Sequence, residues 1–167
     1  EGEWQFLSCD IHPHKLKLSD AGAKRLGLSC LRTMLADARE HHAAWDRAAD
    51  VVIADVPCSG LGIIRKKPDI RYKNPEELAQ LPIIQREILE NVCRYVRSGG
   101  VLVYSTCTIL PEENEQVTEA FLQAHPEFER TAFTLPLPIG TCDGQLTLWP
   151  QRHGTDGFYI CRMRRKD

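Results

Sequence analysis

The sequence contains no apolar run that approaches the roughly 18 residues needed to cross a bilayer. Its first residues do not have the pattern of a signal peptide. The seven cysteines include no CxxC pair of the kind that holds structural zinc. We therefore expect neither a membrane-bound protein nor a metal site. Because the cysteines are odd in number and irregularly spaced, they indicate a reducing cytoplasm rather than a disulfide framework.

The sequence also lacks the strong positive charge typical of nucleic-acid binders, since the net charge is -2. The basic residues are grouped, however. The segment Ile64–Lys73 carries one acid and five basic residues, namely Arg65, Lys66, Lys67, Arg71 and Lys73. A second group ends the sequence at Arg162–Lys166. Such groups either bind a phosphate backbone or form ordinary solvated loops and tails.

What is present fits one globular domain of ordinary composition. The chain has 167 residues, of which 43% are hydrophobic and 26% charged. This length suffices for one domain with a real core and is short for two. Cys9, Cys93 and Cys161 lie in apolar stretches, where we expect thiols that pack as small hydrophobes.

One stretch combines a strand pattern with reactive groups. The apolar run Val51–Ala54 predicts a strand buried on both faces. Asp55, Pro57, Cys58 and two glycines follow it directly. In open α/β sheets, ligands bind at the carboxyl ends of such strands. Considered alone, the stretch could equally be a buried strand with a tight turn that happens to contain a cysteine.

Strand and helix patterns alternate along the chain, which predicts an α/β fold with a mostly parallel sheet. A helix over Glu76–Arg97 has the clearest apolar face, and Pro111 with the following acids suits the first turn of another. A hairpin of two antiparallel strands ends the chain. The expected elements are strands at 4–10, 28–35, 51–54, 101–107, 145–149 and 158–163, and helices at 13–26, 76–97 and from 111.

Five polar or reactive side chains follow the predicted parallel strands, and we expect them at one edge of the sheet: Asp10, Asp37, Asp55, Cys58 and Cys107. Asp10 suits a ribose-binding acid or a helix cap. Asp37 suits an acceptor for an adenine amino group or merely ends a strand. Cys107 suits a nucleophile with a lowered pKa or an inert buried thiol.

Together, three motifs resemble the bacterial Fmu/Sun (RsmB-like) branch of RNA cytosine-5 methyltransferases. They are Asp55–Gly60, Tyr104–Thr108 and Pro111–Glu115. Further matches are Cys9–Ile11, Arg71, Gln85 and Asp156–Tyr159, so that the resemblance covers nearly the whole chain.

The resemblance implies a Rossmann-like class I fold that uses S-adenosylmethionine, with RNA, and ribosomal RNA in particular, as substrate. It implies that Cys107 adds to C6 of a cytosine and thereby activates C5, and that Cys58 helps to resolve the adduct. It assigns Asp10 to the ribose and Asp37 to the adenine of the cofactor. It also assigns Asp55 to cofactor binding, at the junction of cofactor and base, where it could help to polarise the cytosine. The basic segment then becomes a contact for the RNA backbone.

The sequence departs from this family at its start. The family's first strand, with the glycine-rich loop that embraces the methionine end of the cofactor, has no counterpart here, nor has the N-terminal RNA-binding domain. We therefore expect residues 1–167 to form a single partial catalytic domain that binds the cofactor poorly and is inactive alone. Two other classes remain: a non-catalytic module that binds RNA or a partner protein, and a dinucleotide-dependent oxidoreductase, which has no evident use for two cysteines.

Overall fold

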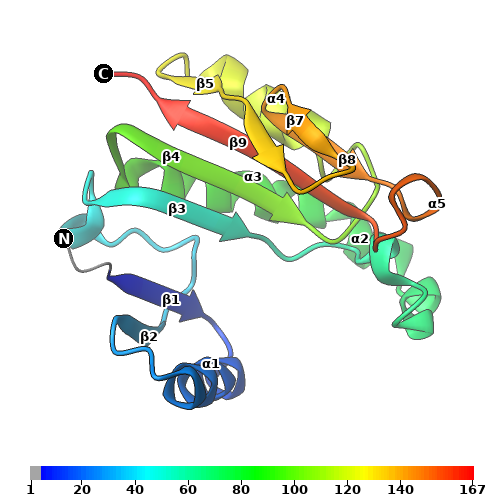
Figure 1. Cartoon of the computed structure of the whole chain (residues 1–167), viewed down its shortest axis with the longest axis horizontal. Helices are drawn as coiled ribbons and strands as arrows, with labels where there is room; N and C mark the ends of the chain where they lie inside the picture. The colour runs from blue at the N-terminus through cyan, green and yellow to red at the C-terminus, as the bar shows by residue number, and fades with distance from the viewer. Residues whose placement is uncertain (1–4) are drawn as a thin grey trace. The chain divides into compact units, whose positions relative to one another are not determined.

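The computed structural model describes residues 5–167. They form two compact units, one up to His41 and the other from His42 onward (Figure 1). Trp4, the first residue of the first predicted strand, lies outside the described residues. Within residues 5–167, no helix combines the length and the apolar character that crossing a bilayer requires.

The first unit is one strand–helix–strand motif. Strand β1 (Phe6–Asp10) precedes helix α1 (Pro13–Leu26) in the sequence, and strand β2 (Leu31–Leu35) follows it. The two strands pair with each other in parallel. The helix begins with a proline, which needs no N–H there, and ends where Gly27 adopts φ 68°. The predicted motif is thus confirmed, although β2 begins three residues later than expected because the preceding residues form the connection.

The second unit is built on a mixed sheet with the strand order β3-β4-β9-β5, and β8 pairs with β9 as well. The bounds are β3 (Ala49–Asp55), β4 (Val96–Thr106), β5 (Phe128–Arg130), β8 (Gln145–Leu148) and β9 (Phe158–Arg165). Strands β3 and β4 are parallel, whereas β9 is antiparallel to its three partners. This confirms the α/β class and the C-terminal hairpin, and it makes the sheet of this unit more antiparallel than expected.

Helices α3 (Leu81–Val92) and α4 (Glu115–Ala124) pack on one face of this sheet (Figure 1). The core between them and the sheet includes Ile88, Leu89, Val92, Leu102, Tyr104, Val117, Phe121, Tyr159, Cys161 and Met163. Of the three cysteines expected to be buried, Cys93 and Cys161 are buried, whereas Cys9 is exposed on β1.

The helix predicted over Glu76–Arg97 is interrupted. It consists of α2 (Pro75–Ala79), α3 and a 3-10 turn, η4 (Cys93–Tyr95). Pro82 lacks the N–H that would continue a single helix, and the chain has already entered β4 at Val96. The predicted start of the next helix is also wrong, because α4 begins at Glu115 and leaves Pro111–Asn114 as a turn.

The opposite face of β3 is exposed. Val51 and Ile53 are 50% and 70% exposed, so the prediction of a strand buried on both faces is wrong. These residues pair with Val101 and Val103 of β4, which places all four side chains on the face opposite α3 and α4. Strand β3 pairs with β4 on one side, and within residues 5–167 no strand pairs with its other edge.

Smaller elements complete the second unit. Strands β6 (Phe133–Leu135) and β7 (Gly140–Cys142) form an antiparallel hairpin, and α5 (Pro150–His153) precedes β9. Three further 3-10 turns are η1 (Ala43–Trp45), η2 (Leu61–Ile63) and η3 (Pro68–Tyr72).

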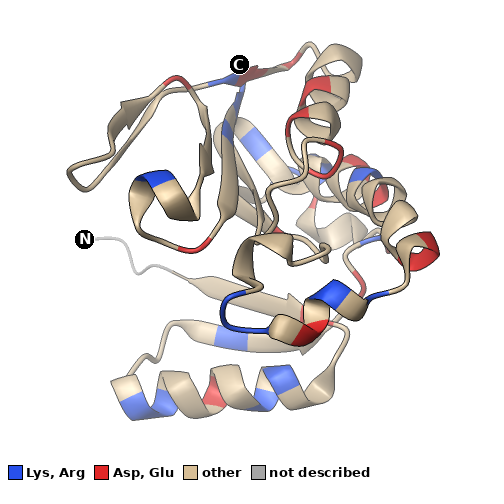
Figure 2. Ribbon diagram, turned by 90° about the vertical axis from the view of Figure 1, so that its right-hand side faces the viewer, with Lys and Arg blue, Asp and Glu red and all other residues tan. Residues whose placement is uncertain are grey.

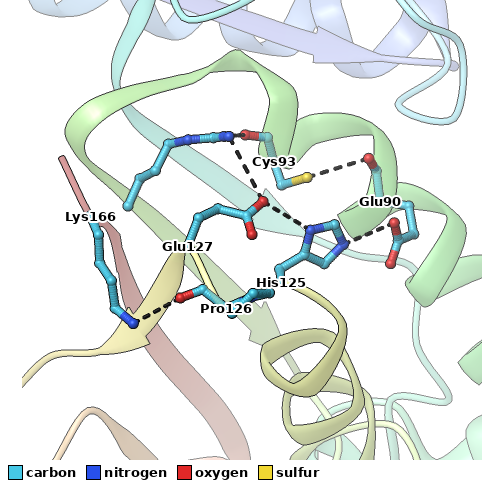
Figure 3. A network of polar contacts seen from close by, with 7 residues as sticks. Glu90, Cys93, His125, Pro126, Glu127 and Lys166 are labelled. Carbon is cyan, nitrogen blue, oxygen red and sulfur yellow. Dashed lines mark hydrogen bonds and ion pairs between the residues drawn. The ribbon is translucent and has the colours of Figure 1, made fainter.

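A polar network fastens the C-terminal end of β9 to the helices (Figure 3). Arg165 donates to the carbonyl of Cys93 at 3.1 Å and lies 3.8 Å from Glu127. The ring of His125 joins Glu127 to Glu90 of α3 through contacts of 3.2 and 3.0 Å. This network lies at the opposite end of β9 from Tyr159, which pairs with Thr106 at the carboxyl end of β4.

The backbone of η2 crosses that of the segment before β9 at two glycines. Gly157 donates to the carbonyl of Gly62 at 2.8 Å, and a Cβ on Gly62 would collide with the Gly157 carbonyl group. Gly62→Ala should therefore lower the free energy of unfolding by about 2 kcal/mol or more, because backbone cannot yield as a side chain does.

Urea unfolding followed by circular dichroism measures this change. The matched control is Gly22→Ala in α1, where a Cβ meets nothing within 4 Å. It should leave stability unchanged or raise it by up to ~1 kcal/mol. Equal stability of Gly62→Ala and the unmodified chain would refute the close crossing.

Candidate active site

The loops that follow β3 and β4 bring two cysteines together. Because these strands are parallel neighbours, with Asp55 opposite Ser105, both chains leave the sheet at the same edge. The sulfur of Cys58 lies 3.2 Å from the sulfur of Cys107, and it also accepts a hydrogen bond from the Cys107 backbone N–H at 3.3 Å. Both side chains are half-buried. The expected convergence of Asp55, Cys58 and Cys107 is therefore observed.

The two thiols have different acidities. A hydrogen bond from the Cys58 thiol lowers the pKa of Cys107 to about 7, and the charge of Lys73 acts in the same direction, although burial and the Asp55 carboxylate oppose them. The pKa of Cys58 is raised, because its proton is held by Cys107 and because the group is largely buried. Cys107 is thus the thiol that ionises first and the better nucleophile near neutral pH.

Asp55 ends β3 beside this pair. Its Oδ1 accepts a hydrogen bond from the Ser105 hydroxyl at 3.0 Å. Asp55 is exposed to solvent. The negative charge of Asp55 raises the pKa of Cys107 and so opposes the effect of the hydrogen bond from Cys58. The edge of the sheet therefore presents a carboxylate and a thiolate together.

A buried carboxylate holds the Cys58 loop in place. Glu113 is 2% exposed, and its Oε2 accepts hydrogen bonds from the Ser59 backbone N–H and from the Gln85 side chain, both at 2.9 Å. The same Gln85 amide nitrogen donates to the Pro57 carbonyl at 2.9 Å. The residues on both sides of Cys58 are thus tied to one charge below the loop, which restricts the position of its sulfur.

Further buried polar groups tie the two loops to each other. The hydroxyls of Ser59 and Thr108 lie 2.7 Å apart. Asn114 accepts from the Thr106 hydroxyl at 2.6 Å and donates to the Thr108 carbonyl at 3.2 Å, which brackets Cys107 on both sides. The same turn is held from β4, since the Tyr104 hydroxyl donates to the Glu113 carbonyl at 2.6 Å.

From the sequence, Glu113 was expected in the first turn of a helix and as part of the motif Pro111–Glu115, and Gln85 only as a match to the family. Neither was expected to hold the Cys58 loop. A periodic signal was available for both. Glu113 lies four residues before Val117, in phase with the buried residues of α4, and Gln85 lies in phase with Ile88 and Val92 of α3. A polar residue at a buried helical position needs a polar partner, and here the two are partners of each other.

Side chains of the basic segment form more hydrogen bonds and ion pairs within the protein than we expect of a loop that only binds RNA. It includes the blue loop that leads into η3 (Figure 2). Lys73 donates to the Ser59 carbonyl at 2.9 Å, and Arg71 donates to the Pro68 carbonyl at 3.2 Å. Arg65 and Lys66 both pair with Asp156, whereas Lys67 is exposed. Lys73 thus belongs to the surroundings of the two cysteines.

Asp10 and Asp37 lie in the first unit, each at or just beyond the carboxyl end of its strand. Oδ1 of Asp10 accepts from the His12 N–H at 2.8 Å, and its other oxygen lies 3.2 Å from the Lys15 ammonium. Burial raises the pKa of Asp10, but these two partners outweigh it and leave the pKa below its ordinary value. Hydrogen bonds from Arg39 lower the pKa of Asp37. The cofactor roles of both acids stay predictions.

Comparison with known proteins gives a consistent result. A sequence model of the family described as "16S rRNA methyltransferase RsmB/F" matches residues 2–164. The chain is 43% identical over 166 residues to a Bacillus subtilis protein named "Probable ribosomal RNA small subunit methyltransferase B", covering 95% of this chain and 37% of that protein. It is 32% identical over 174 residues to an Escherichia coli O157:H7 protein named "Ribosomal RNA small subunit methyltransferase F", covering 98% and 35%.

Solved structures have the same fold. The crystal structure of PH0851 superposes with a TM-score of 0.86 at 33% identity, covering 96% of this chain and 37% of that one. The structure of NSun6 from Pyrococcus horikoshii with SFG superposes with a TM-score of 0.75 at 24% identity, covering 98% and 42%. The chain thus spans well under half the length of these similar proteins.

The difference in acidity between the two thiols is directly measurable. The rate at which iodoacetamide alkylates Cys107 should rise with pH around a midpoint near 7, because the thiolate is the reactive form. Cys58→Ala removes the hydrogen bond that stabilises this thiolate, so the midpoint should move to higher pH.

Peptide mass spectrometry after timed alkylation follows each cysteine separately. Cys9 is an internal control, since burial raises its pKa and its midpoint should lie above that of Cys107. A midpoint for Cys107 that Cys58→Ala leaves unmoved would show that the contact between the sulfurs does not set its acidity.

Proposed function

This chain belongs to the 16S rRNA methyltransferase RsmB/F family, and we propose that it is part of an enzyme that methylates C5 of a cytosine in RNA. The observation that carries the proposal is the pair of sulfurs 3.2 Å apart, in which Cys107 is the acidic member. The names of the similar proteins favour ribosomal RNA as the substrate. That substrate, like the reduced cysteines, agrees with a cytoplasmic enzyme.

The chemistry requires a nucleophile because C5 of cytosine reacts poorly while the ring is conjugated. The Cys107 thiolate adds to C6, the C5=C6 electron pair moves toward C5 and the ring, and C5 becomes a carbon nucleophile. Asp55, at the same edge of the sheet, helps to polarise the base. After methyl transfer, a base takes the proton from C5, the electrons of the C5–H bond re-form the C5=C6 bond, and the bond between C6 and Cys107 breaks to release the thiolate. Cys58 helps to resolve the adduct in this step.

S-adenosylmethionine would supply the methyl group. The chain fits this cofactor only in part: Asp10 and Asp37 suit its ribose and adenine, and Asp55 suits the junction with the base, but the sequence holds no counterpart of the glycine-rich loop for the methionine end. We propose that a preceding segment of the same protein supplies this loop. The open edge and exposed face of β3 support the proposal, because a further strand can pair with that edge and the residues connected to it can cover apolar side chains on the face, such as Ile53.

The RNA has to present an unstacked base, since a half-buried thiol cannot reach a cytosine inside a helix. We assign the backbone contact to the basic segment. Arg65, Lys66 and Lys67 are exposed at its start, and Arg71 lies in η3. RNA phosphates would compete with Asp156 for Arg65 and Lys66. Lys73 is closer to the reacting groups, where its charge favours the Cys107 thiolate.

RNA that carries 5-fluorocytosine tests the assignment of the two cysteines, because fluorine at C5 blocks release of the adduct. In a longer protein that joins this chain to its preceding segment, Cys107→Ala should abolish the covalent complex seen by denaturing gel electrophoresis. Cys58→Ala should retain the complex and accumulate adducts on ordinary RNA as well.

The chain of 167 residues alone is the negative control. It should form no adduct, and calorimetry should detect no micromolar binding of S-adenosylmethionine, because the loop for the methionine end is absent from it. Trapping by Cys107→Ala would refute the nucleophile. RNA binding by the longer protein without any adduct or methyl transfer would favour a non-catalytic module instead.

A further inference from the structure

We propose that Cys58 and Cys107 form an oxidation site at which a hydroperoxide converts the two thiols into a disulfide. The geometry points to this reaction. The sulfurs are 3.2 Å apart, and a disulfide bond is about 2.05 Å long, so they need to approach by only about 1.2 Å. Both residues lie in loops beyond the ends of β3 and β4, outside any helix or strand, so that the approach requires a change of the two side chains and not of the sheet.

The site has the three properties of a thiol pair that senses oxidants. The attacking thiol, Cys107, is acidic. It is half-buried rather than sealed in the core, so a small peroxide can reach it. A second thiol already touches it and can resolve the first oxidation product. The three remaining cysteines of the second unit are less suitable. Cys93 and Cys161 are buried in the core and are 3% and 0% exposed, and the sulfur of Cys142 contacts the Gly140 carbonyl rather than a second thiol.

The reaction balances with the peroxide as the only oxidant. The Cys107 thiolate attacks one peroxide oxygen, the O–O bond breaks, and Cys107 becomes a sulfenic acid while the second oxygen leaves as hydroxide and takes up a proton. The Cys58 thiol then attacks the Cys107 sulfur. The S–S bond forms, the S–O bond breaks, and the departing hydroxide takes the Cys58 proton as water. Two thiols and hydrogen peroxide thus give a disulfide and two waters.

Disulfide formation would have two consequences, of which the first rests on the proposed function. The oxidised pair contains no free nucleophile, so that methylation would stop. The resolved pair is also protected from further oxidation of Cys107 to sulfinic acid, which thiols do not reverse. Reduction by a cellular dithiol would restore both groups.

Peptide mass spectrometry of this chain after mild treatment with hydrogen peroxide tests the proposal. After alkylation of the remaining thiols, trypsin releases Cys58 in the peptide 48–65 and Cys107 in the peptide 98–130, each with no other cysteine. We expect these two peptides to be joined, with a mass about 2 Da below their sum, and dithiothreitol to separate them.

Two variants sharpen the result. In Cys58→Ser, Cys107 should proceed to sulfenic acid, captured by dimedone, and to sulfinic acid. Cys142→Ser is the matched control, because Cys142 is a half-buried thiol in β7 whose sulfur contacts the Gly140 carbonyl, and it should give the same joined peptides as the unmodified chain. Circular dichroism confirms that each variant is folded. Sulfinic acid at Cys107 without a joined peptide in the unmodified chain would overturn the proposal.

The experiment needs neither RNA nor S-adenosylmethionine. Failure to form the disulfide would therefore leave the proposed methyl transfer intact. Conversely, a disulfide would form in a protein that methylates nothing, so each proposal can fail separately.

Discussion

The parallel pairing of β3 with β4 determines the geometry of the candidate site. Asp55 lies opposite Ser105, and both chains therefore leave the sheet together, three residues before Cys58 and two before Cys107. A shift of one residue in this register would turn the side chains of one strand to the other face and would separate the loops. The contact between the sulfurs, the hydrogen bond from Ser105 to Asp55 and the acidity of Cys107 all depend on this register.

The register is held by polar groups below the site as well as by the apolar core. Burying the Glu113 carboxylate costs free energy unless donors compensate for lost water, and here Ser59 and Gln85 donate to it. Asn114 holds the loop around Cys107 through two hydrogen bonds, one from the Thr106 hydroxyl and one to the Thr108 carbonyl. Such a network fixes loops whose backbone has left the sheet and would otherwise be mobile. Both motifs around the cysteines are thus explained as parts of one scaffold.

Much of the fold could be predicted from local chemistry. Pro13 and Gly27 bound α1 because each suits only one end of a helix, and the C-terminal hairpin follows from two strand patterns around a turn. The convergence of Cys58 and Cys107 follows from parallel strands. The wrong predictions concern features that depend on how the rest of the chain packs, and a local pattern does not contain that information. An apolar run cannot reveal whether both its faces are covered, so the exposure of Ile53 was missed.

The reactive residues of the site could be predicted from the sequence, but the residues that hold the loops around them in place could not. The motifs pointed to Asp55, Cys58 and Cys107, but the lowered pKa of Cys107 depends on the contact between the two sulfurs, which only the three-dimensional structure reveals. Lys73 was grouped with other basic residues because a run of charge does not show which member turns inward toward Ser59. Glu113 was read as an acid at a helix start, because only the turn before α4 brings it under the loops.

The central claim is that Cys107, rather than Cys58, forms the bond to the base. The most direct measurement is the mass-spectrometric mapping of the nucleotide left on the longer protein after its complex with 5-fluorocytosine RNA has been digested with nuclease and trypsin. The added mass should lie on the peptide 98–130, at Cys107. Its presence on the peptide 48–65, at Cys58, would contradict the account.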